Sequence, residues 1–407
     1  MTRREFLMAM LGSGLLLTAC GTEREPVDNF SKLEVKNLRQ IITADPSTSR
    51  TIMFQADEPL SDPIIELQLD DTIRSIKAVD CSFDDDEHTH HQYSARIDNL
   101  KAGAAYKYRV VDGSARTDWH ALKTADGNSF KALIFPDSQC ADYGVWASVA
   151  MAAYEKNPDA EFFINVGDIV DNGEDRTQWQ AWFDGAPFID RIPFVPVMGN
   201  HETYNRQWEV REPVAYLKLF DVPSNNIAAF ERYYYSFDRG DVHWIVLNTE
   251  PFAGLIDEQK SWLRADVEAS DRKWRVVLLH RDVLQYRIIG RPERQEGISE
   301  SGQDFMPLFD ELGIDLVLSA HLHTYRNRGR IFNFERSEHG ALYILTGLAG
   351  DVRYPIWIDH ELDEYVAPQP ETDNYLTLEA SDDELVVKCY LPDGREIDRA
   401  VVTKPSE

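Results

Sequence analysis

The sequence has little positive charge. Its 407 residues carry 42 Lys and Arg against 70 Asp and Glu, which gives a net charge of −28. Proteins that bind nucleic acid or anionic membranes by neutralising phosphates present a basic face, so this balance argues against both for the folded body. An anionic substrate would need positive charge concentrated at its own site.

Cysteine is scarce and long apolar runs are absent. The four cysteines, Cys20, Cys81, Cys140 and Cys389, form no CxxC pair, which argues against a zinc ribbon or a dithiol redox motif. Stability must therefore come from a hydrophobic core, for which 43% hydrophobic residues suffice. The length suits two or three domains, and we find no internal repeats.

The one marked apolar run is N-terminal. Residues 6–19 follow Arg3 and Arg4 and are too short to span a bilayer comfortably, which is typical of a signal peptide over 1–20. Residues 17–21 resemble a bacterial lipoprotein box with lipid on Cys20, and residues 2–7 resemble a twin-arginine export signal. We expect a bacterial cell-envelope protein, lipid-anchored on the periplasmic or extracellular face, with residues 21–30 as a linker. The alternative is a short buried or interfacial helix.

Two structural segments follow. Residues 31–125 show short alternating runs such as Tyr106–Val110, separated by turns, which predicts a small β-sandwich. From residue 131, apolar strands alternate with helical patterns, and residues 372–403 return to a β meander. This order predicts a layered α/β domain over 130–403 with a largely buried central sheet.

Polar, metal-competent residues follow the predicted strands of the second segment. They are Asp137, Gln139, Asp168, Asn200, His201, Glu202, His280, His321 and His323. Asp137, Asp168 and Asn200 are 31 and 32 residues apart, about one β–α–β unit each. We therefore expect these side chains at the carboxyl edge of the sheet, where open α/β sheets bind ligands.

These residue types suit two cations. Imidazole nitrogens with carboxylate and amide oxygens favour Mn, Fe or Zn, and a carboxylate can bridge two such ions, which can then clamp a phosphoryl group. Taken alone each motif is weak, because an Asp after a strand is often only a helix cap. The ordered set of five blocks is much more specific.

The blocks resemble the calcineurin-like metallophosphoesterases, whose pattern is DxH…GDxx…GNH[DE]…H…GHxH. The closest resemblance is to purple-acid-phosphatase-like members with a fibronectin-III-like N-terminal domain. It implies a four-layer αββα sandwich over 130–403, preceded by the all-β sandwich over 31–125, whose residues 99–109 resemble a tyrosine corner.

The resemblance also implies a role for each residue. Asp137 and His323 would bind the first metal, Asn200, His280 and His321 the second, and Asp168 both. His201 would act on the leaving-group oxygen as general acid or transition-state stabiliser, and Glu202 would orient it or tune its pKa. Apart from the resemblance, Arg281 adjoins a ligand and is expected to add positive charge there.

Three positions depart from the family pattern. Ala320 stands where the last block has Gly, but a small residue still fits close packing there. Gln139 stands where the family has His and would hold the first metal more weakly. Asp171 replaces the tyrosine ligand of purple acid phosphatases, so we expect no iron–tyrosinate colour; a visible band lost on replacing a tyrosine such as Tyr143 would contradict this.

The expected function is hydrolysis of phosphomonoesters by attack of a metal-bound hydroxide, with a phosphorylated small molecule as substrate and no nucleic acid as partner. A phosphodiesterase or nucleotidase using the same site is one alternative. A non-catalytic surface lipoprotein that binds cell-wall polymer or another protein is another.

Three further features are left open by the sequence. Arginines after two of the histidine motifs either form an electropositive rim or pair with Glu293, Glu296 and Glu300; they are Arg281, Arg287, Arg291, Arg294, Arg326, Arg328 and Arg330. Tyr204, Trp208 and Tyr325 either stack on an aromatic leaving group or pack internally. Residues 84–91, rich in Asp and His, are interpreted as an acidic turn leading into a strand rather than as a metal site.

Overall fold

A computed structural model describes residues 30–85, 88–288, 290–354, 358, 360–368 and 373–404. The expected signal peptide with Cys20, and the linker up to residue 29, lie outside the described residues. Within the described part of the chain, we find no helix that combines the length and the apolar character needed to cross a membrane.

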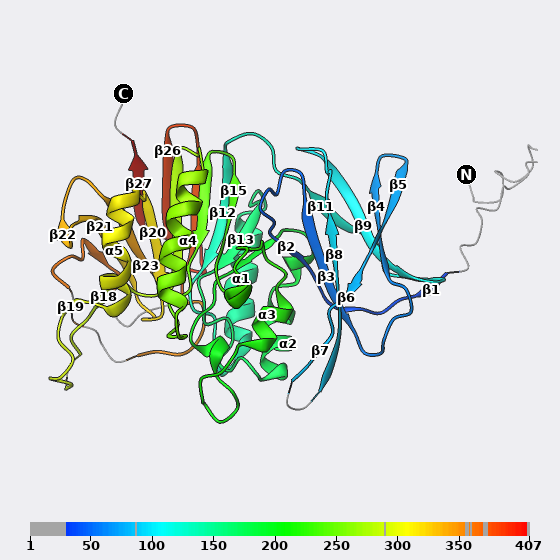
Figure 1. Ribbon diagram of the computed structural model, residues 1–407, viewed down its shortest axis with the longest axis horizontal. Helices are drawn as coiled ribbons and strands as arrows, with labels where there is room; N and C mark the ends of the chain where they lie inside the picture. Colours follow the sequence, from blue (N-terminus) through cyan, green and yellow to red (C-terminus); the bar gives the residue numbers. More distant parts are fainter. Residues whose placement is uncertain are drawn as a thin grey trace, which may run out of the picture.

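The N-terminal region is all β, drawn in blue to cyan in Figure 1. One sheet has the order β1-β10-β9-β4-β5 with β11 beside β9, and facing it lie β2, β3, β8 and β6. Alternate residues such as Ile65, Tyr108 and Phe54 share one buried core, as period-two strands require. The strands are β1 Ser31–Lys32, β2 Lys36–Ile41, β3 Arg50–Ala56, β4 Ile64–Leu69, β5 Thr72–Lys77, β6 Val79–Asp80, β7 Phe83–Asp84, β8 Thr89–Ile97, β9 Ala105–Asp112, β10 Ala115–Arg116 and β11 His120–Lys123.

The segment that resembles a tyrosine corner contains a hydrogen bond between the tyrosine hydroxyl and the backbone. The Lys101 backbone N–H donates to the Tyr106 hydroxyl over 2.8 Å, closing the turn before β9. The finer likeness of this sandwich to a fibronectin type III domain stays a prediction.

The second region contains two sheets rather than the single central sheet that the alternation of strands and helices predicted. One sheet includes β12 Phe130–Phe135, β13 Phe162–Asn165, β14 Phe194–Pro196, β25 Tyr375–Ala380, β26 Glu384–Tyr390 and β27 Glu396–Thr403. The other comprises β15 Tyr235–Arg239, β16 Val242–Val246, β17 Trp274–Arg281, β20 Leu316–Ala320, β21 Tyr325–Phe332, β22 Glu335–Arg336, β23 Ala341–Thr346 and β24 Tyr365–Val366. A separate pair joins β18 Leu284–Gln285 to β19 Gly297–Ile298.

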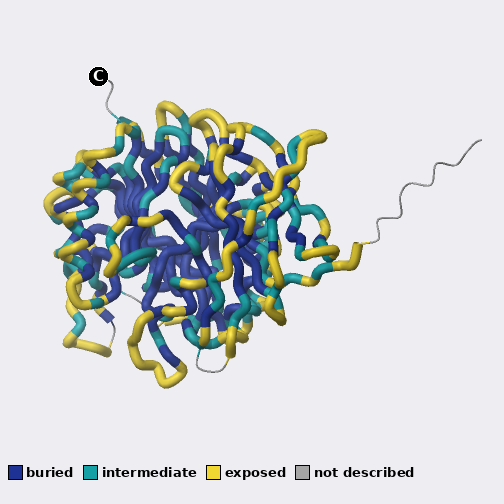
Figure 2. The backbone as a smooth tube through the Cα atoms, turned by 45° about the vertical axis from the view of Figure 1, so that its right-hand side comes forward, coloured by how far each residue is buried: buried dark blue, intermediate teal, exposed yellow. Residues whose placement is uncertain are grey.

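The two sheets pack face to face through large aromatic rings, and the dark blue interior of Figure 2 is this core. The Trp244 ring lies 5.6 Å from Phe162 and 6.3 Å from Phe130 across the interface. Both faces of each sheet are covered, which is why these strands are almost continuously apolar.

Helices cover the outer faces. Trp146 of α1 Tyr143–Lys156 and Trp182 of α2 Arg176–Gly185 pack on the first sheet. Leu263 of α4 Leu255–Ala269 and Phe305 of α5 Glu300–Leu312 pack on the second. The remaining helical turns are α3 Val214–Leu219, η1 Pro187–Asp190, η2 His201–Thr203 and η3 Ala228–Phe230. The four-layer αββα arrangement implied by the family resemblance is therefore confirmed.

The β-sandwich and the α/β region share a sheet. Strand β2 runs parallel to β14, with Ile41 opposite Phe194, and the Ile42 N–H donates to the Phe194 carbonyl over 3.0 Å. A loop separates β11 from β12, but the shared sheet makes the two regions one hydrogen-bonded unit. The exact domain boundaries stay a prediction.

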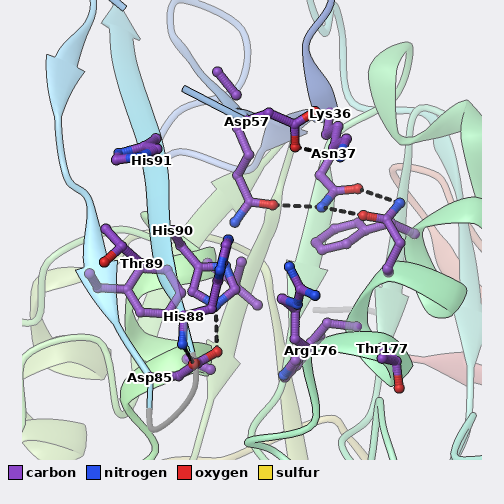
Figure 3. A pocket seen from close by; sticks show the side chains of 18 of the residues that line it. Lys36, Asn37, Asp57, Asp85, His88, Thr89, His90, His91, Arg176 and Thr177 are labelled. Atoms are coloured by element: carbon purple, nitrogen blue, oxygen red, sulfur yellow. Dashed lines mark hydrogen bonds and ion pairs between the residues drawn. The ribbon is translucent and has the colours of Figure 1, made fainter. Parts of the chain in front are cut away.

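A pocket of about 540 Å³ lies at this junction and is shown in Figure 3. Asn37 has a left-handed backbone (φ 50°) at a register shift in β2, and its amide donates to Gln55 over 2.6 Å and exchanges hydrogen bonds with Gln180 of α2. A bulge that re-aims one side chain thus links the two regions through amide groups.

The Asp- and His-rich segment forms another wall of this pocket. As expected it leads from β7 into β8, and His90 Nε2 lies 2.5 Å from Asp85 Oδ2 while its ring stacks on Phe83. Asp86 and Glu87 lie outside the described residues. The Asp and His groups of the described chain that could hold a metal are elsewhere.

One buried histidine couples β16 to α4. His243 Nδ1 is 2.7 Å from Asp238 Oδ1, and its Nε2 is 3.0 Å from Asp266 Oδ2. Arg272 and Ser236 complete the cluster by donating to Asp238 and Asp266. Burial alone would lower the pKa of His243, but the two carboxylates raise it to about 9.

This cluster predicts a pH-dependent contribution to stability. A histidine whose folded pKa lies above its unfolded value stabilises fully below that unfolded value of about 6.5, and the effect is lost as pH rises through 9. His243→Gln should lower the free energy of unfolding by about 2 kcal/mol at pH 6 and by clearly less at pH 10. Urea denaturation at pH 6, 8 and 10 measures this, with the exposed His339→Gln as control. A difference that stays constant with pH would contradict the assignment.

Candidate metal centre

Loops from both sheets meet at one edge of the α/β region. Asp137, Asp168 and Asn200 follow β12, β13 and β14 of the first sheet, while His280 lies near the end of β17 and His321 and His323 follow β20 of the second. The structure thus brings together residues that are up to 186 positions apart, with each sheet supplying part of the set.

Two groups at this edge have metal-binding geometry, and they share one residue. Asp168, His280 and His321 form the first group, and Asp137, Asp168 and His323 form the second. Within each group the ligand atoms lie within 4.8 Å of one another. The shared position of Asp168 is the one expected of a carboxylate that bridges two ions.

Three of these residues adopt a backbone conformation that is uncommon for side-chain-bearing residues. The φ angles are 48° at Asp168, 75° at His321 and 51° at His323. Such left-handed residues cost about 1–2 kcal/mol each, and strain of this kind is concentrated at functional sites. The surrounding structure must therefore hold these turns in place.

Glu202 holds the turn at Asp168. Its carboxylate, 1% exposed, accepts the backbone N–H groups of Asp168 at 3.0 Å, Ile169 at 2.8 Å and Gly199 at 2.7 Å. This differs from the expected role, in which Glu202 orients His201. The carboxylate is directed to the backbone instead, so Glu202 is a positioning residue for the shared ligand.

Two glycines let the ligand loops approach closely. A Cβ at Gly167 (φ 91°) would lie 2.4 Å from His280 Nδ1, and one at Gly199 would lie 2.2 Å from Asp168 Oδ1. A side chain at either of these glycines, which precede Asp168 and Asn200, would therefore clash with a candidate ligand.

Backbone carbonyls fix which histidine nitrogens face the site. His280 Nδ1 lies 2.9 Å from the Val166 carbonyl, and His323 Nδ1 lies 2.6 Å from the Val352 carbonyl. Each Nδ1–H donates to its carbonyl, so Nε2 is the nitrogen that faces the site and can bind a cation once it is deprotonated. Burial alone would lower the pKa of His280, but without a metal Asp168 raises it to about 10, so a bound cation would have to displace this proton. Nε2 of His280 lies 3.0 Å from Asp168 Oδ2, and Nε2 of His323 lies 3.4 Å from Asp137 Oδ1.

The residues fit bound cations by a second criterion. Several buried polar atoms here have no hydrogen-bond partner: Gln139 Oε1, Asp168 Oδ2, His321 Nδ1 and His323 Nε2. Native proteins rarely leave such atoms unsatisfied. Metal ions would satisfy them, and Gln139 Oε1 offers the neutral oxygen expected where the family has His.

The ionisation of Asp168 and His321 also favours cations. Burial alone would raise the pKa of Asp168, but His280 and His201 hold it well below its usual range. Burial, and then the charge of His280, lower the pKa of His321 well below its usual value. A charged carboxylate and a neutral imidazole are the forms that bind metals.

His201 lies at the mouth of the site. Its Nε2 is 3.9 Å from Asp168 Oδ2 and 3.3 Å from Gln139 Nε2, and its Nδ1 is 2.6 Å from the Asp171 carbonyl. Asn200 lies deeper, with Oδ1 3.3 Å from His280 Nε2. Asp171, rather than Glu202, orients His201.

For Arg281, Arg326 and Arg328 the structure shows ion pairs rather than a free electropositive rim, whereas for the exposed Arg287 and Arg291 the rim stays a prediction. Arg281 reaches the site, beside a cavity of about 380 Å³ that also contacts His321, but its guanidinium pairs with Glu250 at 3.0 and 2.8 Å. Arg326 pairs with Asp363 and Arg328 with Asp282, and these four side chains are buried. For Arg326 and Arg328 both sequence interpretations were wrong, because their partners come from segments distant along the chain.

Sequence reasoning missed Tyr354 and Glu250. The Tyr354 ring stacks on His323 with centroids 4.2 Å apart, but it follows β23 in an irregular segment that carries no motif. Tyr143 is not directed at the site; its hydroxyl accepts the Asp171 N–H over 3.1 Å.

Comparison with known proteins identifies the family. The model of the calcineurin-like phosphoesterases matches residues 117–325, which include every candidate ligand. The chain belongs to the calcineurin-like phosphoesterase family. This confirms the resemblance seen in the sequence.

Similar proteins include purple acid phosphatases of Arabidopsis thaliana. Purple acid phosphatase 15 is 24% identical over 318 residues, which is 70% of this chain and 57% of that protein. Probable inactive purple acid phosphatase 9 is also 24% identical, over 70% of this chain and 50% of its own length. A purple acid phosphatase from yellow lupin (Lupinus luteus) seeds has the same fold, with a TM-score of 0.77, 15% identity and coverage of 91% of this chain and 74% of that one.

The shared position of Asp168 predicts the result of removing its charge. Asp168→Asn should reduce the metal content of both halves of the centre, because the neutral amide binds cations less well and its NH₂ group faces the site. Elemental analysis of purified protein measures this. Asp171→Asn, the same change on a neighbouring carboxylate outside both groups, should keep its metal; equal metal content in the two variants would contradict the shared role.

Proposed function

We propose that this protein hydrolyses phosphoesters, phosphomonoesters above all, with two transition-metal ions such as Mn, Fe or Zn in the metal centre. The observation that carries the proposal is the carboxylate of Asp168 shared between two Asp–His groups, with His201 at their mouth. The names of the similar acid phosphatases support it.

The residues divide the chemistry between them. Asp137, Gln139 and His323 would hold one ion, Asn200, His280 and His321 the other, and Asp168 both. When bound, such a pair of ions neutralises charge on a phosphoryl group and activates water at neutral pH.

His201 is placed to assist the leaving group. The Asp171 carbonyl accepts the Nδ1 proton and fixes the ring, so Nε2 is directed toward the shared carboxylate and the space above it. A proton on Nε2 can pass to the departing alkoxide, which is general-acid catalysis. Arg281 adds positive charge at the rim that Glu250 largely balances.

A panel of phosphomonoesters and diesters, assayed on protein of measured metal content with Mn, Fe and Zn supplied, tests the proposal. Faster hydrolysis of monoesters is expected; preference for diesters would favour the phosphodiesterase or nucleotidase alternative. No hydrolysis of any ester by metal-loaded protein would favour a non-catalytic surface protein, and a probable inactive relative gives that outcome a precedent.

His201→Ala should reduce turnover by about 10²–10⁴-fold, because the leaving group then departs without a proton donor. Metal content should stay unchanged, since His201 belongs to neither metal-binding group. Steady-state kinetics together with elemental analysis on the same preparation checks both points. Loss of metal would show that His201 is a ligand.

We also propose that the protein is exported and anchored by lipid on Cys20, on the evidence of residues 1–21 alone. Cys20→Ser expressed from the full-length gene in a bacterium should move the protein out of the membrane fraction and abolish labelling by a fatty acid. Cys81→Ser is the matched control and should behave as the wild type. Labelling that persists in Cys20→Ser rules out the anchor.

A further inference from the structure

Three aromatic rings flank the metal centre, and the proposed mechanism uses none of them. Trp208 is 54% exposed and Tyr354 is 39% exposed, both among the large apolar side chains most open to solvent. Tyr204 lies beside both His201 and Trp208 and is less exposed than Trp208. We call these three residues the aromatic wall.

A specific turn holds Trp208 outward. Its φ of 64° is left-handed, which is uncommon for a bulky residue. The Trp208 N–H donates to the Asn205 carbonyl over 2.8 Å, and the Asn205 side chain accepts the Glu209 N–H over 2.8 Å. Asn205 itself is 5% exposed and its carbonyl also accepts from Asn172 Nδ2 over 2.8 Å. The exposed indole is therefore tied to the loop that follows Asp168.

The wall stands beside the proposed proton donor. The His201 ring lies 5.4 Å from Tyr204 and 6.0 Å from Trp208, both edge to face, and Tyr204 and Trp208 are 5.8 Å apart. The Tyr204 hydroxyl is 3.5 Å from Asn200 Nδ2. A leaving group that takes a proton from His201 must extend past these rings.

Tyr354 provides the third ring, beside a different histidine of the centre. It stacks on His323, a candidate ligand, while His201 and Trp208 come from a separate loop. Tyr325, the third aromatic residue noted in the sequence, is excluded because it is 1% exposed and its hydroxyl bonds Asp398. For Tyr325 internal packing was the correct interpretation.

Binding by aromatic rings is also compatible with the strongly negative net charge of the molecule. The net charge is −28, and the arginines nearest the centre are paired with carboxylates. Arg281, Arg326 and Arg328 therefore offer little free positive charge to a multiply charged leaving group. Stacking on flat rings gives affinity without charge, because every planar aromatic ligand has a face that an indole can cover.

We propose that the aromatic wall binds the leaving group of the substrate and selects phosphoesters whose leaving group carries a planar aromatic ring, either an aryl group or a nucleobase. This inference rests on the proposed phosphoesterase function and adds the class of substrate to it. An aryl ring bonded directly to the ester oxygen would contact Tyr204, whereas the base of a nucleoside monophosphate, one sugar farther out, would reach Trp208.

The test compares kcat/KM for phenyl phosphate, a nucleoside 5′-monophosphate and glycerol phosphate. Trp208→Ala should lower the value for the nucleotide by about 10-fold, which corresponds to the lower part of the range for one aromatic–base stack. Tyr204→Ala should lower the value for phenyl phosphate more than that for the nucleotide. Glycerol phosphate, which has no ring, should lose much less in both variants.

Conservative and remote variants separate stacking from folding. Trp208→Phe keeps a ring and should recover most of the selectivity, and Phe332→Ala removes an exposed ring outside the wall and should leave all three values unchanged. Equal losses on all three substrates, or no loss on the aromatic ones, would overturn the proposal and would leave Trp208 as a structural residue or a contact for another macromolecule.

A binding measurement distinguishes a failure of the aromatic wall from a failure of the proposed phosphoesterase function. If metal-loaded wild type hydrolyses no ester, the proposed function fails, and calorimetry with phenylphosphonate and methylphosphonate then tests the wall by itself. About 10-fold tighter binding of the phenyl compound, lost in Tyr204→Ala, supports the wall. Equal affinity for both phosphonates refutes it.

Discussion

The carboxylate of Asp168 is the group on which the rest of the site depends. It lies buried between imidazoles that come from the opposite sheet, on a turn whose backbone is left-handed. Three features stabilise this turn. The carboxylate of Glu202 accepts the N–H groups of the turn, and the Ser138 and Gln139 N–H groups donate to the Asp168 carbonyl. Gly167 and Gly199 have no side chain, which leaves room for Asp168 and His280. Unsatisfied atoms of four residues then face a common space, which is the arrangement that cations complete.

The architecture explains how such distant residues meet. Each sheet supplies part of the ligand set. The aromatic core packed between the two sheets fixes the positions of their strand ends relative to each other. The β-sandwich is joined to the same framework through β2 and β14, so it extends the first sheet instead of hanging from a flexible linker. Asn37 and Gln180 reinforce the junction with side-chain hydrogen bonds. The ligand loops thus rest on one continuous, close-packed body.

Much of this could be predicted from the sequence because its signals are local. Strand ends, the glycines before Asp168 and Asn200, and the His-x-His spacing each reflect a short-range constraint. The division into two sheets could not be predicted from the alternation of strands and helices, because β16 and β17 alternate with helices just as β12 and β13 do, and it came only from the family resemblance. Glu202 was given the wrong contact because its partners are backbone N–H groups, which no side-chain pattern records. The burial of Arg326 and Arg328 depended on Asp363 and Asp282, which only the fold brings near. Tyr354 carried no signal at all.

Under the proposed function, an acidic protein would have to attract anionic phosphoesters against its own negative field, and the cations, rather than Arg281, Arg326 and Arg328, would supply the positive charge. Anomalous diffraction from crystals grown with Mn or Zn tests this most directly. The account predicts two peaks, one on each side of the Asp168 carboxylate, with His280 and His321 at one and Asp137 and His323 at the other. A single peak, or peaks that do not share Asp168, would contradict it.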